Sequence, residues 1–545
     1  MLLWSIIILF PIIFFLAHKI KKLPKWSIIT IFSLLVLLRF YLSTTVNGYQ
    51  IDFGWATNWC MNMVTLPLRK VYFQGFFVNY QPFGMIIYGL TGLLGKLFHT
   101  LPSLPNGITA FWPWGLAPNG ELPNYQNTYT LMPVFSRLWV LTFKFIPICA
   151  DIALAYIAYW LGKKYSSERI GLITAALMLI CPAMAIDTVY WGQLDSVLTL
   201  LIVLSIIFLV RVAEKNQTKD WIIASGILTL AICTKPQAIF FVPLFVAVMI
   251  KKLNIKNLGL TILATLFFPF SFLIFAKKWD RINFLLSIAT ILIVATLVTL
   301  PFQGPIIGNI TWLVDQITST AGTYKQFTLN AYNIFLLLTS NLSLIKSNDM
   351  PLDSSGNIVS SWKFYMALIP VLVTFGTVWL YHIFTKQPKP KKNQKEQAPA
   401  PLPAQTILFL LGGILMLAIF VFMPQMHERY SYPALIMFYL AYASMPKNTS
   451  KISEGNQPKF FTFHSSPFTL LAPLIPVISV SFFANCMSAF SPFVLGGGDI
   501  WNKLYSQAAN TGPFFSIVYI LSLAYAIYII PKLLKTGRIT NGKQA

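Results

Sequence analysis

Apolar runs long enough to cross a lipid bilayer recur along this 545-residue chain. A helix needs about 20 apolar residues to span the hydrocarbon core, and two of the runs here are shorter and depend on their neighbours. Because lipid offers the backbone no hydrogen-bond partners, such segments must be helical. We therefore predict an all-α polytopic membrane protein. The clearest runs are 28–46, 172–185, 196–210, 284–300, 405–422 and 514–530.

The distribution of charge agrees with a membrane location. Only 10% of the residues are charged, whereas a soluble protein carries about a quarter. A net charge of +24 could indicate nucleic-acid binding, but the Lys and Arg residues lie mostly in short loops between the apolar runs. In that position they report membrane orientation by the positive-inside rule, so we exclude nucleic acid as a partner. The five cysteines are scattered without metal-ligand spacing, and we interpret them as packing residues.

The basic loops predict about thirteen membrane crossings with the N-terminal loop inside. Residues 1–25 are predicted to be an extra membrane helix and a basic loop. A cleaved signal peptide is disfavoured, because no basic residue precedes the apolar run and no small-residue cleavage site follows it. The long outer stretch 47–136 is rich in Tyr, Trp and Pro, so we expect short interfacial helices there. Residues 385–403 are rich in Lys, Gln, Ala and Pro and are predicted to be a flexible cytoplasmic linker.

One segment does not fit this topology. Residues 258–276 resemble a crossing, yet the basic residues on both sides of the segment suggest the same inner face. Either the segment is re-entrant and bends at Pro269, or the two short helices that meet at Lys235-Pro236 make a single crossing. Proline removes a backbone donor and disfavours helix in the residue before it, so either break is compatible with the sequence.

A few ionisable residues lie inside predicted crossings, where charge is costly and indicates a functional or paired side chain. Arg137, Lys144 and Asp151 are spaced by seven residues, which places them on one stripe of a helix. The stripe either faces the bundle and forms ion pairs or lines a transport pathway. Arg39 is either similar or extends toward the membrane interface.

Four polar clusters lie at predicted outer helix ends and bring carboxylates, a lysine, a histidine and an arginine to one membrane face. A carboxylate can deprotonate an acceptor as a general base. Lys, Arg and His can bind a phosphate, and Arg can do so through two parallel hydrogen bonds. This set suits transfer of a group from a lipid phosphate. The clusters are residues 49–53, 187–195, 235–237 and 427–430.

At these clusters the sequence resembles the GT-C superfamily of membrane glycosyltransferases. The resemblance is to the branch with dolichyl-phosphate-glucose glucosyltransferases, the mannosyltransferases of GPI-anchor assembly and their bacterial relatives. Gln81 replaces the first proline of a Tyr-Pro-Pro element, Asp195 stands where some members have Asn, and the first outer loop lacks an Asp-x-Asp or Asp-Glu pair. The matching elements are Asp52, Asn79-Tyr80-Gln81-Pro82, Asp187 with Gln193, Lys235-Pro236-Gln237, Leu300-Pro301-Phe302, Asn330-Ala331-Tyr332-Asn333 and His427-Glu428-Arg429.

The resemblance implies roles for these residues. Asp52 would be the catalytic base, and His427, Arg429 and Lys235 would bind the donor phosphate. No cofactor is firmly implied. The missing acidic pair disfavours a metal-dependent mechanism, although a divalent cation between Asp187 and Asp195 stays open as the alternative. The other residues expected to line the site are Asp187, Gln193, Asp195, Tyr80 and Glu428.

The implied activity is an inverting transfer of a hexose, of the mannose or glucose type. The donor is a polyprenyl-phosphate sugar in the membrane lipid, and the acceptor is a lipid-linked or cell-surface glycan. We expect a bacterial plasma membrane with the site facing the periplasm. A nucleotide sugar is disfavoured because the sequence shows no soluble nucleotide-binding domain. The alternatives are a glycan polymerase or ligase of another fold, a lipid-linked saccharide transporter and an inactive scaffold.

The same resemblance divides the chain into four predicted segments. Residues 1–25 are the extra N-terminal helix with its basic loop, and residues 26–330 are the catalytic GT-C module. Residues 331–445 hold the second outer loop, the linker and the helices next to the His-Glu-Arg element. Residues 446–545 add the C-terminal membrane helices.

Overall fold

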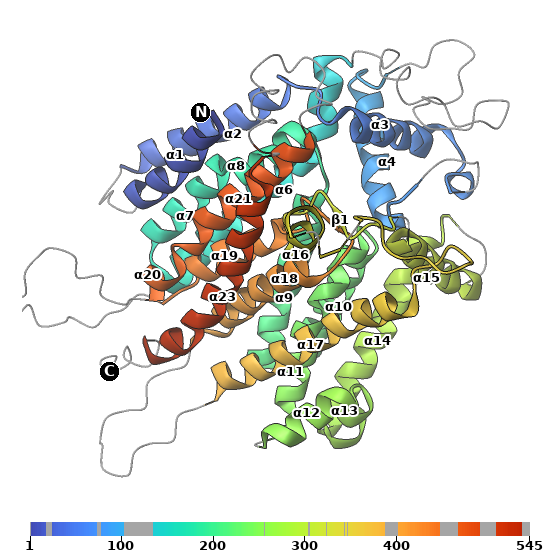
Figure 1. Cartoon of the computed structure of the whole chain (residues 1–545), viewed down its shortest axis with the longest axis vertical. Coiled ribbons are helices and arrows are strands. Elements are labelled where there is room, and N and C mark those ends of the chain that lie inside the picture. Colours follow the sequence, from blue (N-terminus) through green and yellow to red (C-terminus); the bar gives the residue numbers. More distant parts are fainter. Residues whose placement is uncertain are drawn as a thin grey trace, which may run out of the picture.

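The computed structural model is a helical bundle, in which two short strands form a two-stranded sheet within the described residues (Figure 1). The predicted all-α polytopic fold is therefore confirmed. The structure describes residues 2–17, 24–72, 78–102, 135–255, 257–302, 306–322, 324–342, 344–345, 347–386, 402–446, 467–490, 508 and 510–536.

Eight helices in the described part of the chain are long and apolar enough to cross a membrane. A bent pair, Glu168–Ile180 with Pro182–Trp191, raises this number to nine if it is one span. The predicted count of about thirteen crossings is not confirmed by these helices. The eight are Trp26–Ser43, Arg137–Ser166, Asp195–Lys215, Lys278–Thr299, Ser360–Thr385, Ala404–Phe422, Thr469–Ala489 and Gly512–Leu533.

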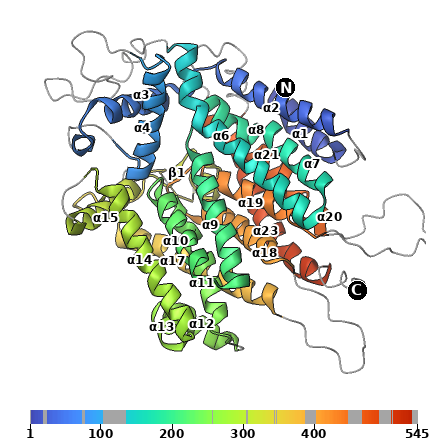
Figure 2. The ribbon, with the colours of Figure 1, turned by 180° about the vertical axis from the view of Figure 1, so that it is seen from behind.

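In the described part of the stretch 47–136, the helices α3 and α4 pack against each other beside α6 (Figures 1 and 2). α3 begins at Gln50, so Asp52 lies in its first turn. α6 begins where the Ser136 hydroxyl accepts a hydrogen bond from the Trp139 amide at 3.1 Å. The elements in this part are α1 (Leu2–Ala17), α2 (Lys25–Ser43), α3 (Gln50–Thr65), η1 (Leu68–Lys70), α4 (Pro82–Leu97), α6 (Arg137–Leu161), η3 (Gly162–Ser166) and α7 (Glu168–Ile180).

The middle of the chain contains the segment that did not fit the predicted topology. α10 packs against α9, and the Lys235 ammonium, in the turn between α10 and η5, lies 2.9 Å from the Asp195 carboxylate. Residues 258–276 form two helices of 9 and 6 residues, broken next to Pro269 and too short to span. The choice between a re-entrant segment and a single crossing at the Lys235 turn stays a prediction. The elements are α8 (Pro182–Met184), η4 (Ala185–Trp191), α9 (Asp195–Lys215), α10 (Thr218–Ile232), η5 (Pro236–Phe241), α11 (Val242–Lys252), α12 (Leu258–Leu266), α13 (Phe270–Phe275) and α14 (Lys278–Thr299).

A short parallel sheet joins the second outer loop to the turn between α18 and α19. Thr328 pairs with Met426 and Leu329 with His427. The predicted linker 385–403 lies almost entirely outside the described residues. The remaining elements are α15 (Ile306–Gly322), β1 (Thr328–Leu329), α16 (Ile334–Leu336), η6 (Leu337–Asn341), α17 (Ser360–Thr385), α18 (Ala404–Phe422), β2 (Met426–His427), α19 (Tyr432–Ala443), α20 (Pro467–Leu471), α21 (Leu474–Phe490) and α23 (Gly512–Thr536).

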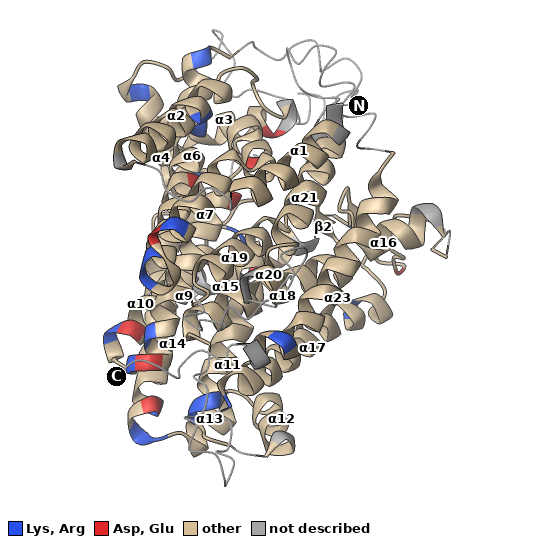
Figure 3. Ribbon diagram, turned by 90° about the vertical axis from the view of Figure 1, so that its left-hand side faces the viewer, with Lys and Arg blue, Asp and Glu red and all other residues tan. Residues whose placement is uncertain are grey.

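The core of the bundle lies around α18 and α19, and every residue of α19 is buried. Peripheral helices instead expose large apolar side chains, for example Leu37 of α2 and Ile293 of α14. Figure 3 shows few charged residues along the middle of the bundle and clusters of them near α10 and α13. Apolar residues on the outside and a buried centre are typical of helices packed in a membrane.

The predicted charged stripe of α6 divides into an exposed end and a buried remainder. Arg137 is exposed, whereas Lys144 and Asp151 are fully buried. Asp151 forms an ion pair with Arg39 of α2, so the ion-pair interpretation is confirmed for Asp151. The alternative that Arg39 extends toward the interface is wrong, because its side chain is buried against this carboxylate.

Candidate active site

A cavity of about 500 Å³ lies at the end of the bundle where α9 begins. It collects side chains from α3, the α4 end of the first outer loop, the turn after η4, the α10–η5 turn and the segment between α18 and α19. Asp187 and Asp195 are fully buried instead, and Asp195 lies behind the wall of this cavity. Of the predicted site residues, those that line the cavity are Asp52, Tyr80, Gln193, Lys235, His427, Glu428 and Arg429.

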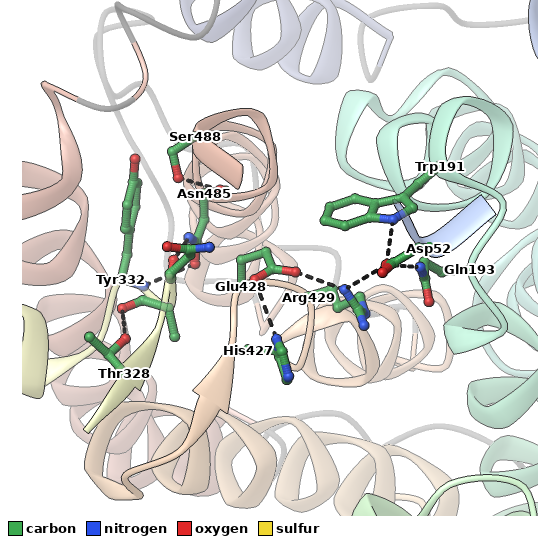
Figure 4. A network of polar contacts seen from close by, with 12 residues as sticks. Asp52, Trp191, Gln193, Thr328, Tyr332, His427, Glu428, Arg429, Asn485 and Ser488 are labelled. Carbon is green, nitrogen blue, oxygen red and sulfur yellow. Dashed lines mark hydrogen bonds and ion pairs between the residues drawn. The ribbon is translucent and has the colours of Figure 1, made fainter. Parts of the chain in front are cut away.

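Asp52 is held by two neutral donors from the turn after η4. Its Oδ2 accepts hydrogen bonds from Trp191 Nε1 at 2.9 Å and from Gln193 Nε2 at 2.8 Å (Figure 4). The Tyr80 hydroxyl donates to Gln193 Oε1 at 3.2 Å and so orients the amide. Both donors act on one oxygen, and a third of the Asp52 side chain is exposed. The other oxygen, Oδ1, takes part in neither of these two bonds.

Two glycines give the backbone the shape that this arrangement needs. Gly192 has a φ of +82° and ends η4 in the left-handed region, so the chain turns between Trp191 and Gln193. Gly48 has a φ of +105°, and a Cβ there would lie 3.0 Å from the Trp191 carbonyl oxygen. Only glycine adopts such conformations at little cost. The loop before Asp52 therefore lies directly against the turn that binds it.

Arg429 occupies the centre of the polar network in Figure 4. Its Nη1 lies 2.8 Å from Glu428 Oε1 and 3.6 Å from Asp52 Oδ2, and its Nε lies 3.6 Å from Asp195 Oδ2. The guanidinium also lies over the Trp191 ring, 5.1 Å from its centre. Three carboxylates and an aromatic face therefore hold this cation beside Asp52, at the cavity wall.

Glu428 connects the side chains of its two neighbours in the sequence, His427 and Arg429. Its Oε2 lies 3.6 Å from His427 Nδ1, while Oε1 binds Arg429. Burial by itself raises the pKa of the Glu428 carboxyl, but the hydrogen bond from His427 and the charge of Arg429 outweigh it, so the pKa lies below its usual value. Glu428 is therefore ionised at neutral pH and orients both neighbours.

Lys235 forms a buried pair with Asp195. Its ammonium lies 2.9 Å from both carboxylate oxygens, and Gln237 Nε2 donates to Asp195 Oδ1 at 3.0 Å. Burial by itself lowers the pKa of Lys235, but the Asp195 carboxylate outweighs it and raises the pKa. The ammonium also lies 5.2 Å from the centre of the Tyr80 ring. Lys235 is therefore a fixed positive charge in the cavity wall.

Replacing Lys235 by methionine is expected to lower the free energy of unfolding by about 3 kcal/mol, because it leaves Asp195 buried without its main counter-charge. Unfolding in detergent measures this change. Lys163→Met is the control, since Lys163 pairs with Glu168 on the exposed surface and such pairs contribute about 0–1 kcal/mol. The double variant Lys235→Met/Asp195→Asn should recover most of the loss. Equal losses in Lys235→Met and Lys163→Met would contradict this account.

Several cavity residues were missed by the sequence reasoning. Trp191 lies inside the predicted cluster 187–195, but its indole N–H was not assigned as a donor to Asp52. Tyr324 packs edge-on against His427, with ring centres 5.2 Å apart, and nothing in the sequence connects these two positions. An indole N–H between acidic residues at a helix end was the one available signal. Among the described residues, no group of three or more His, Cys, Asp or Glu side chains is placed to hold a metal ion.

Residues 136–279 match the family model described as dolichyl-phosphate-mannose-protein mannosyltransferase. This part contains Gln193, Asp195 and Lys235, whereas Asp52 and Arg429 lie on either side of it. No curated protein sequence matches the chain.

Two solved structures from Archaeoglobus fulgidus resemble the fold at low identity. One is the archaeal oligosaccharyltransferase AglB in complex with an inhibitory peptide and a dolichol-phosphate; it is 14% identical over 94% of this chain, with a TM-score of 0.30. The other is the oligosaccharyltransferase tethered to an acceptor peptide containing the NVT sequon; it is 12% identical over 96% of this chain, with a TM-score of 0.29. This chain spans 56% of each. At these TM-scores the likeness carries no argument about the site.

The matched segment, the predicted motifs on either side of it and the helical membrane fold agree with one another. The match over residues 136–279 supports a membrane glycosyltransferase of the GT-C superfamily.

Proposed function

We propose that this protein is an inverting glycosyltransferase that moves a hexose, of the mannose or glucose type, from a polyprenyl-phosphate carrier to a lipid-linked or cell-surface glycan. The observation that carries the proposal is the position of Asp52. Its carboxylate faces the same cavity as Lys235 and His427 and lies 3.6 Å from Arg429. A general base beside a set of cations fits an acceptor hydroxyl next to a phosphate leaving group.

The reaction follows from this geometry. The acceptor hydroxyl gives its proton to Oδ1 of Asp52 while its own oxygen attacks the anomeric carbon of the donor sugar. The bond between that carbon and the phosphate oxygen breaks, and the phosphate keeps the electron pair. Arg429, together with Lys235 and His427, stabilises the charge on the departing phosphate. One displacement inverts the anomeric centre, and the phosphate leaves without a strong general acid.

The distribution of charge supports a site on the extracytoplasmic face. α9 begins with Asp195 at the cavity and ends at Lys215 after a helix of 21 residues, about 30 Å along the helix axis. Lys251 and Lys252 end α11, which follows the Lys235 turn, and Lys278 begins α14. Basic residues at the end opposite the cavity support a cytoplasmic position for that end by the positive-inside rule. In a bacterial plasma membrane the cavity would then face the periplasm.

The transporter alternative is weakened by the contacts of α6. The charged stripe of this helix, as a possible lining of a pathway, gave it some support. Asp151 is committed to Arg39, and the Lys144 ammonium donates to the carbonyls of Ser43 and Val46 at 3.0 and 2.8 Å. Because the charges of Lys144 and Asp151 are already bound to buried partners, they are not available to line a permeation path.

The proposal is tested by incubating the purified full-length protein in lipid nanodiscs with a panel of donors. The panel contains mannosyl- and glucosyl-phosphate polyprenols and, as controls, the matching nucleotide sugars. We expect release of polyprenyl phosphate with at least one lipid donor, by transfer or slow hydrolysis, and no turnover of the nucleotide sugars. Turnover of a nucleotide sugar without turnover of any lipid donor would overturn the proposal.

A further inference from the structure

The buried carboxylate of Asp151 joins α6 to three other elements. Its Oδ2 accepts hydrogen bonds from Arg39 of α2 and from the Thr188 hydroxyl of η4, the latter at 2.5 Å. Its Oδ1 accepts a hydrogen bond from the Tyr432 hydroxyl at the start of α19. Arg39 also donates to Thr188 at 2.9 Å and to the Leu179 carbonyl at 2.8 Å. A buried network with its charges compensated in this way resists rearrangement.

Two of these partners lie one helical turn from a side chain of the cavity. The Tyr432 amide donates to the Arg429 carbonyl at 3.0 Å, so one turn of chain connects the Tyr432 hydroxyl to the Arg429 guanidinium. Thr188 precedes Trp191, the indole donor to Asp52, by three residues in the same helical segment η4. Displacement of Asp151 would therefore be transmitted to both sides of the cavity.

Lys144, two turns before Asp151 on α6, contacts the end of α2 and the start of the loop that leads to Asp52. Its ammonium binds the carbonyls of Ser43 and Val46, where α2 ends and the loop to Asp52 begins. Its Cγ would lie 3.0 Å from a Cβ at Gly192, so its stem packs against the turn between the two donors to Asp52. The loop before the base and the turn that binds it therefore rest on the same side chain.

We propose that Lys144 and Asp151 of α6 set the position of the Asp52 base relative to the Arg429 cation, and that Tyr432 and Thr188 are the positioning residues on the two sides of the cavity. This rests on the proposed function. Neither α6 charge lines the cavity; they act through Arg429, Trp191 and the loop before Asp52. Transfer requires the Asp52 carboxylate at the acceptor and the Arg429 guanidinium at the leaving phosphate at the same time. A small displacement of either group relative to the other lowers the rate strongly.

The test compares two tyrosine-to-phenylalanine variants on α19. Tyr432→Phe removes the hydroxyl that binds Asp151 and keeps the ring. Tyr439→Phe, seven residues later, makes the same change at another fully buried position. We expect Tyr432→Phe to lower kcat for sugar transfer by about 10- to 100-fold with a smaller change in the KM for the donor. Tyr439→Phe should keep the kcat of the unaltered protein. Equal effects would mean that Tyr432 is merely structural and would overturn the proposal.

A conservative pair at Thr188 provides the rescue experiment. Thr188→Val removes the hydroxyl that bonds to Asp151 and keeps the shape, whereas Thr188→Ser keeps the hydroxyl. We expect Thr188→Val to lose kcat in the same way as Tyr432→Phe, and Thr188→Ser to retain most of it. A loss in both variants, or in neither, would contradict a positioning role for this hydroxyl.

Hydrogen exchange separates failure of this inference from failure of the proposed function, because it needs no turnover. We expect the backbone amides of residues 190–193 to exchange faster in Tyr432→Phe than in Tyr439→Phe. If the unaltered protein transfers sugar but the two variants match in kcat and exchange, the positioning proposal fails and the glycosyltransferase proposal stands. If no lipid donor turns over but exchange differs as expected, the proposed function fails and the mechanical link stands.

Discussion

Replacing Asp52 by asparagine is expected to lower the turnover of sugar transfer by about 10²- to 10⁴-fold, the usual contribution of a general base. The change removes the proton acceptor without removing the polar contacts around it. Both hydrogen bonds to Asp52, from Trp191 and Gln193, reach Oδ2. An asparagine whose amide oxygen replaces Oδ2 keeps both bonds, so folding and donor binding should persist.

The measurement is kcat with the best lipid donor, together with the dissociation constant for polyprenyl phosphate. Asp315→Asn is the matched control, since Asp315 is an exposed carboxylate on α15, and its loss should leave kcat unchanged. Full turnover in Asp52→Asn would show that another group is the base. Equal losses in both variants would point to a general effect of charge on the protein.

Replacing Arg429 by lysine is expected to raise the KM for the lipid donor by about 10- to 100-fold, because hydrogen bonds to charged groups contribute about 1.5–3 kcal/mol each. Lysine keeps the positive charge but lacks the planar fork that binds a phosphate through two bonds. It also lacks the flat surface that stacks on the Trp191 ring. Donor binding should therefore fall although the net charge of the cavity is unchanged.

Initial rates over a range of donor concentrations measure this effect. Arg281→Lys is the control, because Arg281 is exposed near the start of α14, away from the cavity. An unchanged donor KM in Arg429→Lys would argue against Arg429 as the phosphate ligand. A weaker affinity for polyprenyl phosphate alone, measured without a sugar, would locate the lost contact at the phosphate rather than at the sugar.

The sequence alone determined the class of fold and the end of the bundle on which the site lies. Apolar length is a local property, and lipid leaves a segment such as 405–422 no alternative to a helix. The order of apolar and basic segments then placed Asp52, Lys235 and Arg429 at helix ends on one face. The helix break at Pro269 could also be predicted from the sequence, because proline lacks a backbone N–H and interrupts the helix in which it lies.

Only the tertiary structure decided which polar groups bind one another. Asp195 and Lys235 are 40 residues apart and Arg39 and Asp151 are 112 apart, and no local pattern selects such partners. The donor role of Trp191 likewise depends on the left-handed turn at Gly192, which brings the side chains of Trp191 and Gln193 to one carboxylate oxygen. Membrane helices are determined by the transfer of each segment from water to lipid, whereas the site is determined by how the finished helices pack, because buried charges must find counter-charges wherever packing brings them.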